Sequence, residues 1–272
     1  MALLSGPPLT EIPMDYKDLN LERDAGIATI CLNRPGARNA FNQSLTDELA
    51  AALDSVAQDQ DIRVVVLTGI GKGFSAGADL VDRESRWDSA EDSLLRGFFP
   101  AIEAVMEMPK PVIAAVNGAA AGVGAAFALA ADLSVMADDA YILLAFSNIG
   151  LVPDGGCHWL LAHTVGHKLA YQIAVEGERL PAARCLELGL CNRVVPSADL
   201  LSEARSWAQR LATRAPLAMA HTKEIMRAAM ESDFRSSFKL EALRQDRCAG
   251  TEDHREGVSA FREKRPPVFR GR

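Results

Sequence analysis

One carboxylate in the sequence stands in a setting that suits proton transfer. Asp154 lies in residues 146–159, FSNIGLVPDGGCHW, between an apolar run and a glycine pair. A well-placed carboxylate can take a proton from a bound substrate and return it. Burial would raise its pKa, whereas a helix beginning near Gly155 would lower it, and the sequence leaves that balance open. The structural alternative is that Pro-Asp-Gly-Gly forms a turn in which Asp154 caps the helix.

Two glycine-containing loops offer backbone N–H groups to a ligand. The first covers residues 73–80 (GFSAGADL) after a predicted strand, and the second covers residues 117–125 (NGAAAGVGA) at the start of a predicted helix. A helix N-terminus has unpaired N–H donors and a positive dipole end. Two such donors that converge on one oxygen form an oxyanion hole. Turns or tight helix packing are the alternative, and neither loop has the pattern of a P-loop or of G-x-G-x-x-G.

Other titratable side chains near these loops have structural interpretations. His158 and His163 follow Asp154 on a predicted helix, and we expect them to be surface or core histidines. Asp79 is expected to cap a helix after the first loop, and Asp132 to open a strand. An acidic run is expected to form a solvated face, with a second catalytic acid as the alternative. Its members are Asp82, Glu84, Asp88, Glu91 and Asp92.

The elements that must position these residues alternate between strands and helices. Residues 19–23 and 26–33 predict a hairpin that turns at residues 24–26, and residues 63–68 predict a strand covered on both faces. Ser44 is predicted to begin a helix, with Asp47 as its capping-box partner. The alternation predicts an α/β core over residues 17–197.

The segments outside this core differ in character. Residues 1–16 are predicted to be a flexible leader, and residues 198–272 to be helical. The apolar faces of the C-terminal helices suit packing on neighbouring chains or within the chain. Residues 111–131 carry no charge and have about the length of a membrane span. Their Ala and Gly content and the break at Asn117-Gly118 predict a buried strand, a loop and a buried helix instead.

Composition restricts the classes of protein. The 272 residues, with 49% hydrophobic content and 24% charged, suit one domain with an appendage. The formal net charge of −7 argues against a nucleic-acid partner. Five scattered cysteines without a C-x-x-C pair indicate reduced thiols and neither a disulfide framework nor a metal site. We therefore predict a cytoplasmic protein with no membrane partner.

Four segments together resemble the crotonase, or enoyl-CoA hydratase/isomerase, superfamily. They are GFSAGADL, PVIAAVNGAAAGVGAAFALAADL, FSNIGLVPDGG and EDHREGVSAFREKRPP, in the family's order and spacing. The resemblance covers residues 17–268 and implies a crotonase-like spiral of ββα turns with a helical C-terminal extension. It further implies an acyl-CoA thioester substrate, with coenzyme A as part of the substrate and no permanently bound cofactor. It implies assembly through the C-terminal region into trimers or dimers of trimers.

The resemblance also implies roles for individual residues. The backbone amides of Ala78 and Val123 match the two oxyanion-hole donors, with Asp154 as the catalytic acid. Phe261 and Lys264 match residues that reach coenzyme A on an adjacent protomer. The full set of expected substrate and coenzyme A contacts is Arg38, Ala40, Ala76, Ala78, Asp79, Leu80, Gly122, Val123, Phe146, Phe261 and Lys264.

The sequence departs from the hydratases of this family at two positions. They carry two glutamates where this chain has Ala126 and Phe146. One carboxylate suffices for isomerisation, because it can remove a proton from one carbon and return it to another across a shared enolate. We therefore expect an isomerase of the enoyl-CoA or phenylacetate-pathway type with Asp154 as proton shuttle. The alternatives are a hydratase with an unmatched acid, a catalytically silent thioester binder, and a dehalogenase that uses Asp154 as nucleophile.

Overall fold

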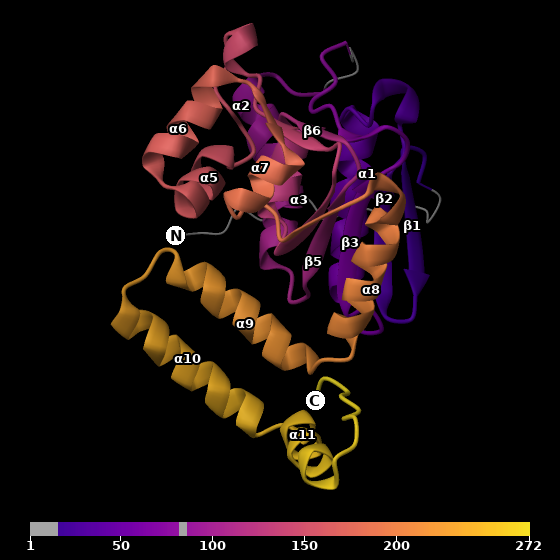
Figure 1. Cartoon of the computed structure of the whole chain (residues 1–272), viewed down its shortest axis with the longest axis vertical. Helices are drawn as coiled ribbons and strands as arrows, with labels where there is room; N and C mark the ends of the chain where they lie inside the picture. The colour runs from indigo at the N-terminus through magenta and orange to yellow at the C-terminus, as the bar shows by residue number, and fades with distance from the viewer. Residues whose placement is uncertain (1–15, 82–85) are drawn as a thin grey trace.

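The computed structural model describes residues 16–81 and 86–272. Two sheets and the helices around them form an α/β body, and the last three helices extend away from it (Figure 1). The predicted leader at residues 1–16 lies outside the described residues except for its last one. Asp82 and Glu84 of the acidic run lie outside them as well.

The first sheet has six strands in the order β1-β2-β3-β5-β7-β10. The hairpin β1-β2 is antiparallel, and the other neighbours pair in parallel. β3 and β5 consist of apolar, mostly β-branched or small residues that are buried throughout, as expected of strands covered on both faces. The strands are β1 (Leu19–Asp24), β2 (Ile27–Leu32), β3 (Val64–Gly69), β5 (Val112–Val116), β7 (Leu133–Ala137) and β10 (Arg193–Val195).

The second sheet is smaller and has the order β4-β6-β8-β9. Its strands are β4 (Gly73–Ser75), β6 (Ala119–Ala121), β8 (Tyr141–Leu143) and β9 (Arg179–Pro181). The pairs β3/β4, β5/β6 and β7/β8 each place one strand in each sheet before the chain enters helices. The helices that close these turns are α3 (Phe99–Glu107), α4 (Val123–Ala130) and α5 (Cys157–Val165). This succession is a spiral of ββα turns.

Further helices and turns complete the body. They are α1 (Gln43–Gln58), α2 (Ala90–Asp92), a π-helical segment at Ser93–Phe98, α6 (His167–Glu176), α7 (Ala182–Glu187) and 3-10 turns at Pro35–Ala37, Ser147–Ile149 and Ser197–Asp199. The predicted start of α1 is wrong: Asn42 is its N-cap, and the Asn42 side chain accepts a hydrogen bond from the Leu45 amide. Ser44 lies within the first turn, where its hydroxyl donates to Glu48. The N-cap is therefore two residues earlier than predicted, and Asn caps at least as well as Ser.

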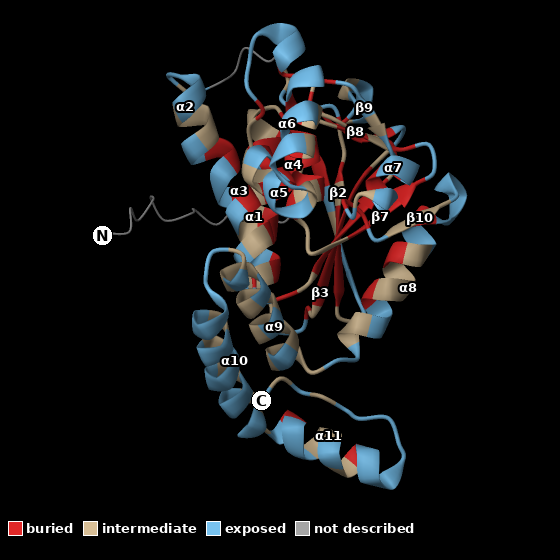
Figure 2. Cartoon of the chain, turned by 60° about the vertical axis from the view of Figure 1, so that its left-hand side comes forward, coloured by how far each residue is buried: buried red, intermediate tan, exposed pale blue. Residues whose placement is uncertain are grey.

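The core lies between the strands and the helices that cover them (Figure 2). The uncharged segment 111–131 is β5, β6 and α4, as predicted, and seven residues of α4 are buried. Within residues 16–81 and 86–272, no helix is long and apolar enough to cross a membrane.

The C-terminal helices divide between the body and an arm. α8 (Leu200–Ala212) packs against the first sheet, with Leu200, Ala204 and Ala208 in the core. α9 (Pro216–Ala229), α10 (Phe234–Ala249) and α11 (Glu252–Glu263) form the arm. Neither α9 nor α10 has a buried residue, which gives the arm large exposed faces (Figure 2).

Candidate active site

The two glycine loops lie against each other because the strands before them are neighbours. β4 and β6 pair in parallel, with Gly73 opposite Ala119 and Ser75 opposite Ala120. The contact continues beyond the strands: a methyl group on Gly77 would lie 3.4 Å from the Gly122 Cα and 3.0 Å from the Ala121 carbonyl oxygen. Glycine is required there for this close approach and for its φ of +93°.

Both predicted oxyanion donors have free N–H groups within the described part of the chain. The flanking amides are used, because Phe41 donates to the Gly77 carbonyl at 2.8 Å and Asp79 donates to the Phe41 carbonyl at 2.9 Å. Phe41 and Ala78 thus pair in an isolated parallel β-bridge, in which the Ala78 amide has no partner among the described residues. Val123 is the first residue of α4, where an N–H lacks an intrahelical acceptor, and no side chain caps it. Two free donors therefore lie at the ends of two abutting loops.

Asp154 is half-buried, and one oxygen of its carboxylate is unsatisfied. Its Oδ1 atom is buried and has no hydrogen-bond partner among the described residues. Burial raises the pKa of Asp154 to about 6, and a hydrogen bond from its own backbone amide offsets this only in part. The balance that the sequence left open thus favours desolvation. The capping alternative is wrong, because Gly156 is the N-cap of α5 and no side chain caps that helix.

Gly155, the residue after Asp154, lies directly against α4, the helix that follows the second loop. A methyl group on Gly155 would lie 2.4 Å from the Ala126 Cβ and 3.7 Å from Val123 Cγ2. Asp154 is therefore held next to the helix that begins with the Val123 amide. Phe146 is buried as well, and its ring lies 3.6 Å from where a Gly122 Cβ would stand. The space around Ala126 is thus filled by the Gly155 backbone.

The other predicted contacts divide between the body and the arm. Arg38 and Ala76 are exposed and adjacent, because the Ala76 amide donates to the Arg38 carbonyl at 3.0 Å. Ala40 is buried, and Leu80 is exposed. Phe261 and Lys264 are on or just after α11, at the end of the molecule far from β6 and α2 (Figure 1). Their side chains are exposed, so within one chain they do not join the loops.

The expectation for Asp79 is wrong. Only a turn follows it directly, and the next described helix, α2, begins at Ala90. Its carboxylate instead accepts from Arg34 at 3.0 Å and from the Val81 amide at 3.2 Å. Capping rules consider only residues near Asp79 in the sequence. They could not predict its ion pair with Arg34, which is distant in the chain.

The remaining titratable residues are structural or solvated. His158 is exposed, and His163 Nδ1 bonds to the Trp159 carbonyl at 2.8 Å. Asp132 opens β7 and binds the Val112 amide at 2.9 Å. Asp88 and Glu91 are exposed, while Asp92 pairs with Arg96. Among the residues that the structure describes, no three of His, Cys, Asp and Glu come together to hold a metal ion.

Sequence reasoning missed the residues that brace the first loop. Asn39 is buried at a φ of +56°, and its amide group donates to the carbonyls of Ile70 and Gly73. The Ser75 hydroxyl donates to the Asn39 carbonyl at 2.8 Å and accepts from the Gly77 amide at 3.1 Å. The one available signal was the position of Asn39 between Arg38 and Ala40, which the resemblance implies to contact the substrate.

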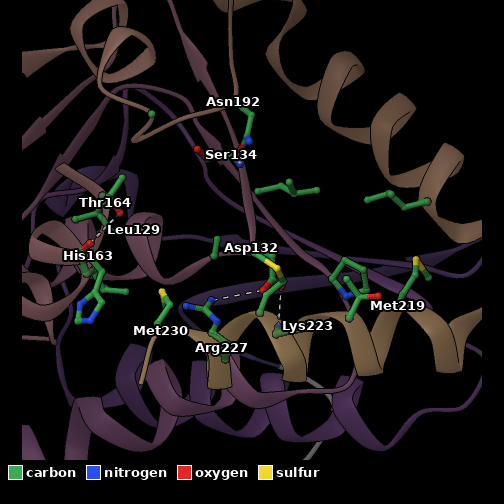
Figure 3. A pocket seen from close by; sticks show the side chains of 18 of the residues that line it. Leu129, Asp132, Ser134, His163, Thr164, Asn192, Met219, Lys223, Arg227 and Met230 are labelled. Carbon is green, nitrogen blue, oxygen red and sulfur yellow. Dashed lines mark hydrogen bonds and ion pairs between the residues drawn. The ribbon is translucent and has the colours of Figure 1, made fainter. Parts of the chain in front are cut away.

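A large cavity lies elsewhere and contains none of the predicted catalytic residues. Its volume is about 850 Å³, and it lies between α9 and the body (Figure 3). Lys223 and Arg227 reach across it to Asp132, at 2.7 and 3.4 Å. These cations are already paired with the Asp132 carboxylate, so the cavity marks the seam between the arm and the body.

Comparisons with known proteins agree with this arrangement. Residues 22–272 match the protein-family model described as enoyl-CoA hydratase/isomerase. A probable enoyl-CoA hydratase of Rhodobacter capsulatus is 39% identical over 259 residues, which is 95% of this chain and 100% of that protein. The 1,2-epoxyphenylacetyl-CoA isomerase of Escherichia coli is 38% identical over 253 residues, 92% of this chain and 97% of that protein.

A solved structure gives the same result for the fold. The crystal structure of an enoyl-CoA hydratase from Bacillus anthracis is 30% identical, with a TM-score of 0.90, and the match covers 94% of this chain and 100% of that one. The expected fold class is confirmed by this similarity.

Proposed function

The chain belongs to the enoyl-CoA hydratase/isomerase family, and from its site we propose that it is an acyl-CoA isomerase that moves a double bond through a thioester enolate. Coenzyme A enters as part of the substrate, and no resident cofactor takes part. The observation that carries the proposal is the half-buried Asp154 carboxylate, whose Oδ1 atom is buried without a hydrogen-bond partner among the described residues. It lies beside the helix that begins at Val123.

The reaction begins at the thioester carbonyl. Its oxygen accepts hydrogen bonds from the Ala78 and Val123 amides, which stabilise the negative charge that develops when a proton leaves the neighbouring carbon. The Asp154 carboxylate takes that proton from C2 of a 3-enoyl thioester and becomes a carboxylic acid. It then returns the proton to C4, which leaves a 2-enoyl thioester and restores the carboxylate. No atom is gained or lost.

The raised pKa suits this exchange. A group with a pKa of about 6 is mostly ionised near neutral pH, yet it accepts a proton more readily than an ordinary carboxylate. The apolar surroundings that raise its pKa also keep water away from the enolate.

The space around Ala126 favours isomerisation over addition of water. The Gly155 backbone fills the position beside Ala126, and Phe146 brings an apolar ring to the neighbouring loop. A hydratase must hold and activate a water molecule, and neither side chain can do so. The similarity to a 1,2-epoxyphenylacetyl-CoA isomerase supports a ring-bearing acyl group as one substrate class.

The second candidate is an enoyl-CoA hydratase. The similarity to the probable enoyl-CoA hydratase of Rhodobacter capsulatus favours it. In this case an acid at a position other than 126 or 146 would activate the water. The candidates are the exposed residues Asp88 and Glu91, which are the described members of the acidic run that do not pair with Arg96.

The decisive experiment separates the two reactions by mass. The purified protein is incubated separately with 3-enoyl-CoA and 2-enoyl-CoA, and the products are followed by chromatography with mass detection. A shifted peak of unchanged mass supports the isomerase, whereas a product heavier by one water supports the hydratase. The Asp154→Asn variant is run alongside, and full isomerase activity in that variant contradicts the proposed mechanism.

We also propose that the chain assembles as a trimer or a dimer of trimers through the arm. Phe234, Phe238 and Leu243 on α10 are exposed apolar residues, and α10 has no buried residue (Figure 2). In that assembly Phe261 and Lys264 would reach the substrate of a neighbouring protomer. Light scattering coupled to size-exclusion chromatography measures the assembly, and a stable monomer at micromolar concentration contradicts it.

A further inference from the structure

We propose that Arg34 is a positioning residue that sets the Ala78 amide in place for the thioester oxygen. This inference rests on the proposed function, in which that amide is an oxyanion donor. Arg34 lies 44 positions before Ala78 in the chain, just after the β1-β2 hairpin, and its guanidinium bonds to Ala40 and Asp79. Its role is therefore to hold a loop and not to perform chemistry.

The Arg34 guanidinium joins two segments through a single nitrogen. Its Nη1 donates to the Ala40 carbonyl and to Asp79 Oδ2, the latter at 3.0 Å. The side chains of Arg34 and Asp79 are 19% and 9% exposed, so this ion pair is mostly shielded from water. Shielding from water strengthens this ion pair. The ion pair in turn fixes Asp79, the residue immediately after Ala78.

The same two segments are joined by their backbones. Ala76 donates to Arg38, Phe41 donates to Gly77, and Asp79 donates to Phe41, at 3.0, 2.8 and 2.9 Å. In a parallel β-bridge, only alternate residues of a segment bond to the other segment. The N–H groups of Phe41 and Asp79 are bonded across the bridge, so the N–H of Ala78 is unbonded and points away from Phe41. A shift of the register by one residue would instead bury that N–H against the neighbouring segment.

The segment that carries this register is strained and needs support. Arg38 and Asn39 both have positive φ values, +51° and +56°, which non-glycine residues rarely adopt. The Asn39 side chain accepts from the Arg34 backbone amide at 2.9 Å. Arg34 thus braces this segment with its backbone and attaches it to the Ala78 loop with its side chain.

Binding of the coenzyme A phosphates is the competing role for Arg34. The geometry argues against it, because the guanidinium already faces two carboxylates, Asp79 at 3.0 Å and Asp18 at 3.8 Å. An exposed arginine that awaits an anion would not be enclosed by two negative groups. The two roles make different predictions for binding and for turnover.

The test compares Arg34→Gln and Asp79→Asn, with Arg34→Lys as the conservative variant. Arg23→Gln is the matched control, because Arg23 lies on the same hairpin and pairs with Asp59 at 3.2 Å but touches neither loop. Each protein is assayed for kcat and KM of isomerisation. Each is also titrated with a conjugated aryl-enoyl-CoA thioester, whose absorption moves to longer wavelength when its carbonyl is polarised.

We expect kcat to fall about 10- to 100-fold in Arg34→Gln and Asp79→Asn, which is below the full loss of one oxyanion donor. The dissociation constant of the probe should change less than about threefold, and its absorption shift should shrink. The double variant should lose no more than Arg34→Gln alone, because Asp79 acts through its contact with Arg34. Arg34→Lys should recover part of kcat, since an ammonium group can pair with Asp79 but lacks the planar fork.

Three outcomes overturn the inference. A weaker probe affinity with unchanged kcat assigns Arg34 to anion binding. Asp79→Asn keeps the shape of the side chain. If this variant leaves both kcat and the absorption shift unchanged, the positioning role is excluded, even if Arg34→Gln fails to fold. An equal loss of kcat in Arg23→Gln shows that general destabilisation is responsible. If the wild-type protein itself produces no absorption shift, the proposed function fails, and that result is distinct from the other three.

Discussion

At the scale of the single residue, Asp154 acquires its chemistry from a half-buried carboxylate with one unsatisfied oxygen. Its Oδ1 atom has no hydrogen-bond partner among the described residues, and burial raises its pKa to about 6. Cys157, one turn further on, is fully buried, and both burial and the Asp154 charge raise the pKa of its thiol. Cys157 is therefore a neutral neighbour that contributes no competing nucleophile.

Replacing Asp154 by Asn should abolish most turnover. The variant keeps the size of the side chain but cannot accept a proton, so kcat for isomerisation should fall about 10²- to 10⁴-fold. Probe affinity should remain close to that of the wild type, because Asp154 is not needed to hold coenzyme A. Steady-state kinetics and a binding titration measure the two effects. A variant with wild-type kcat would transfer the role to another acid.

The pH dependence of activity should follow Asp154. The carboxylate acts as a base, so kcat/KM should rise with pH below about 6 and reach a plateau above it. A plateau that already begins near pH 4 would mean that Asp154 is not the titrating base. The measurement is the initial rate at low substrate concentration between pH 4.5 and 8.5, a range that spans the relevant pKa.

The pH dependence of stability should have the opposite sign. The pKa of Asp154 is higher in the folded state than in the unfolded state, so the folded state binds more protons between about pH 4 and 6. Raising the pH through that range therefore destabilises the wild type, by about 2–3 kcal/mol in total. Urea unfolding of wild type and Asp154→Asn should show the variant gaining relative stability up to about pH 6 and no further. A constant difference across this range contradicts the raised pKa.

At the scale of the elements, the site depends on how closely two loops and a helix approach one another. β4 and β6 bring Gly77 against Gly122, and the turn before α5 brings Gly155 against Ala126. The first turn of α4 is packed as tightly, since a methyl group on Gly124 would lie 2.6 Å from the Ser75 Cβ. At these points the neighbouring atoms leave no room for a side chain, so only glycine fits.

Adjacent glycines before α5 provide a matched pair of variants. Gly155 and Gly156 both have positive φ, but only Gly155 lacks space for a methyl group: nothing lies within 4 Å of one on Gly156. Gly156→Ala should cost about 1 kcal/mol of unfolding free energy and keep most activity. Gly155→Ala should cost about 2–4 kcal/mol and lower kcat, because the collision with Ala126 displaces Asp154. Equal effects in the two variants contradict this account of the site.

At the scale of the whole molecule, one buried ion network attaches the arm to the body. Lys223 on α9 donates to the carbonyls of Val105 and Lys110, at 2.8 and 3.1 Å, and to Asp132 at 2.7 Å. Burial lowers the pKa of Lys223, and the Asp132 charge counters that effect. Asp132 in turn holds the first amide of β5, so the arm is connected to the centre of the first sheet.

Removing this lysine should loosen the arm. Lys223→Met leaves the half-buried Asp132 carboxylate with a weaker set of partners and should cost about 3 kcal/mol of unfolding free energy. The proposed assembly should weaken as well, because the arm would no longer be held in one orientation. Lys168→Met, at an exposed position of α6 in the body, is the control and should have little effect. Urea unfolding and light scattering measure both properties, and equal results for the two variants contradict the network's role.

Patterns within short stretches of sequence determined much of this protein. The alternation of residues 26–33 and the apolar runs at residues 63–68 and 111–116 specified strands, and the glycine loops, Asp154 and the family resemblance were all legible in the sequence. These features follow from residue spacing and turn chemistry, which act between neighbours in the chain.

Only the tertiary structure decided the state of the site. The pKa of Asp154 depends on desolvation by distant segments, so the sequence could not weigh burial against the helix dipole. The role of Asp79 was mistaken because its partner, Arg34, is 45 positions away. The free Ala78 amide and the contact between Gly155 and Ala126 likewise arise where remote segments meet. Unpaired donors and shifted pKa values are properties of packing, and packing exists only once the chain has folded.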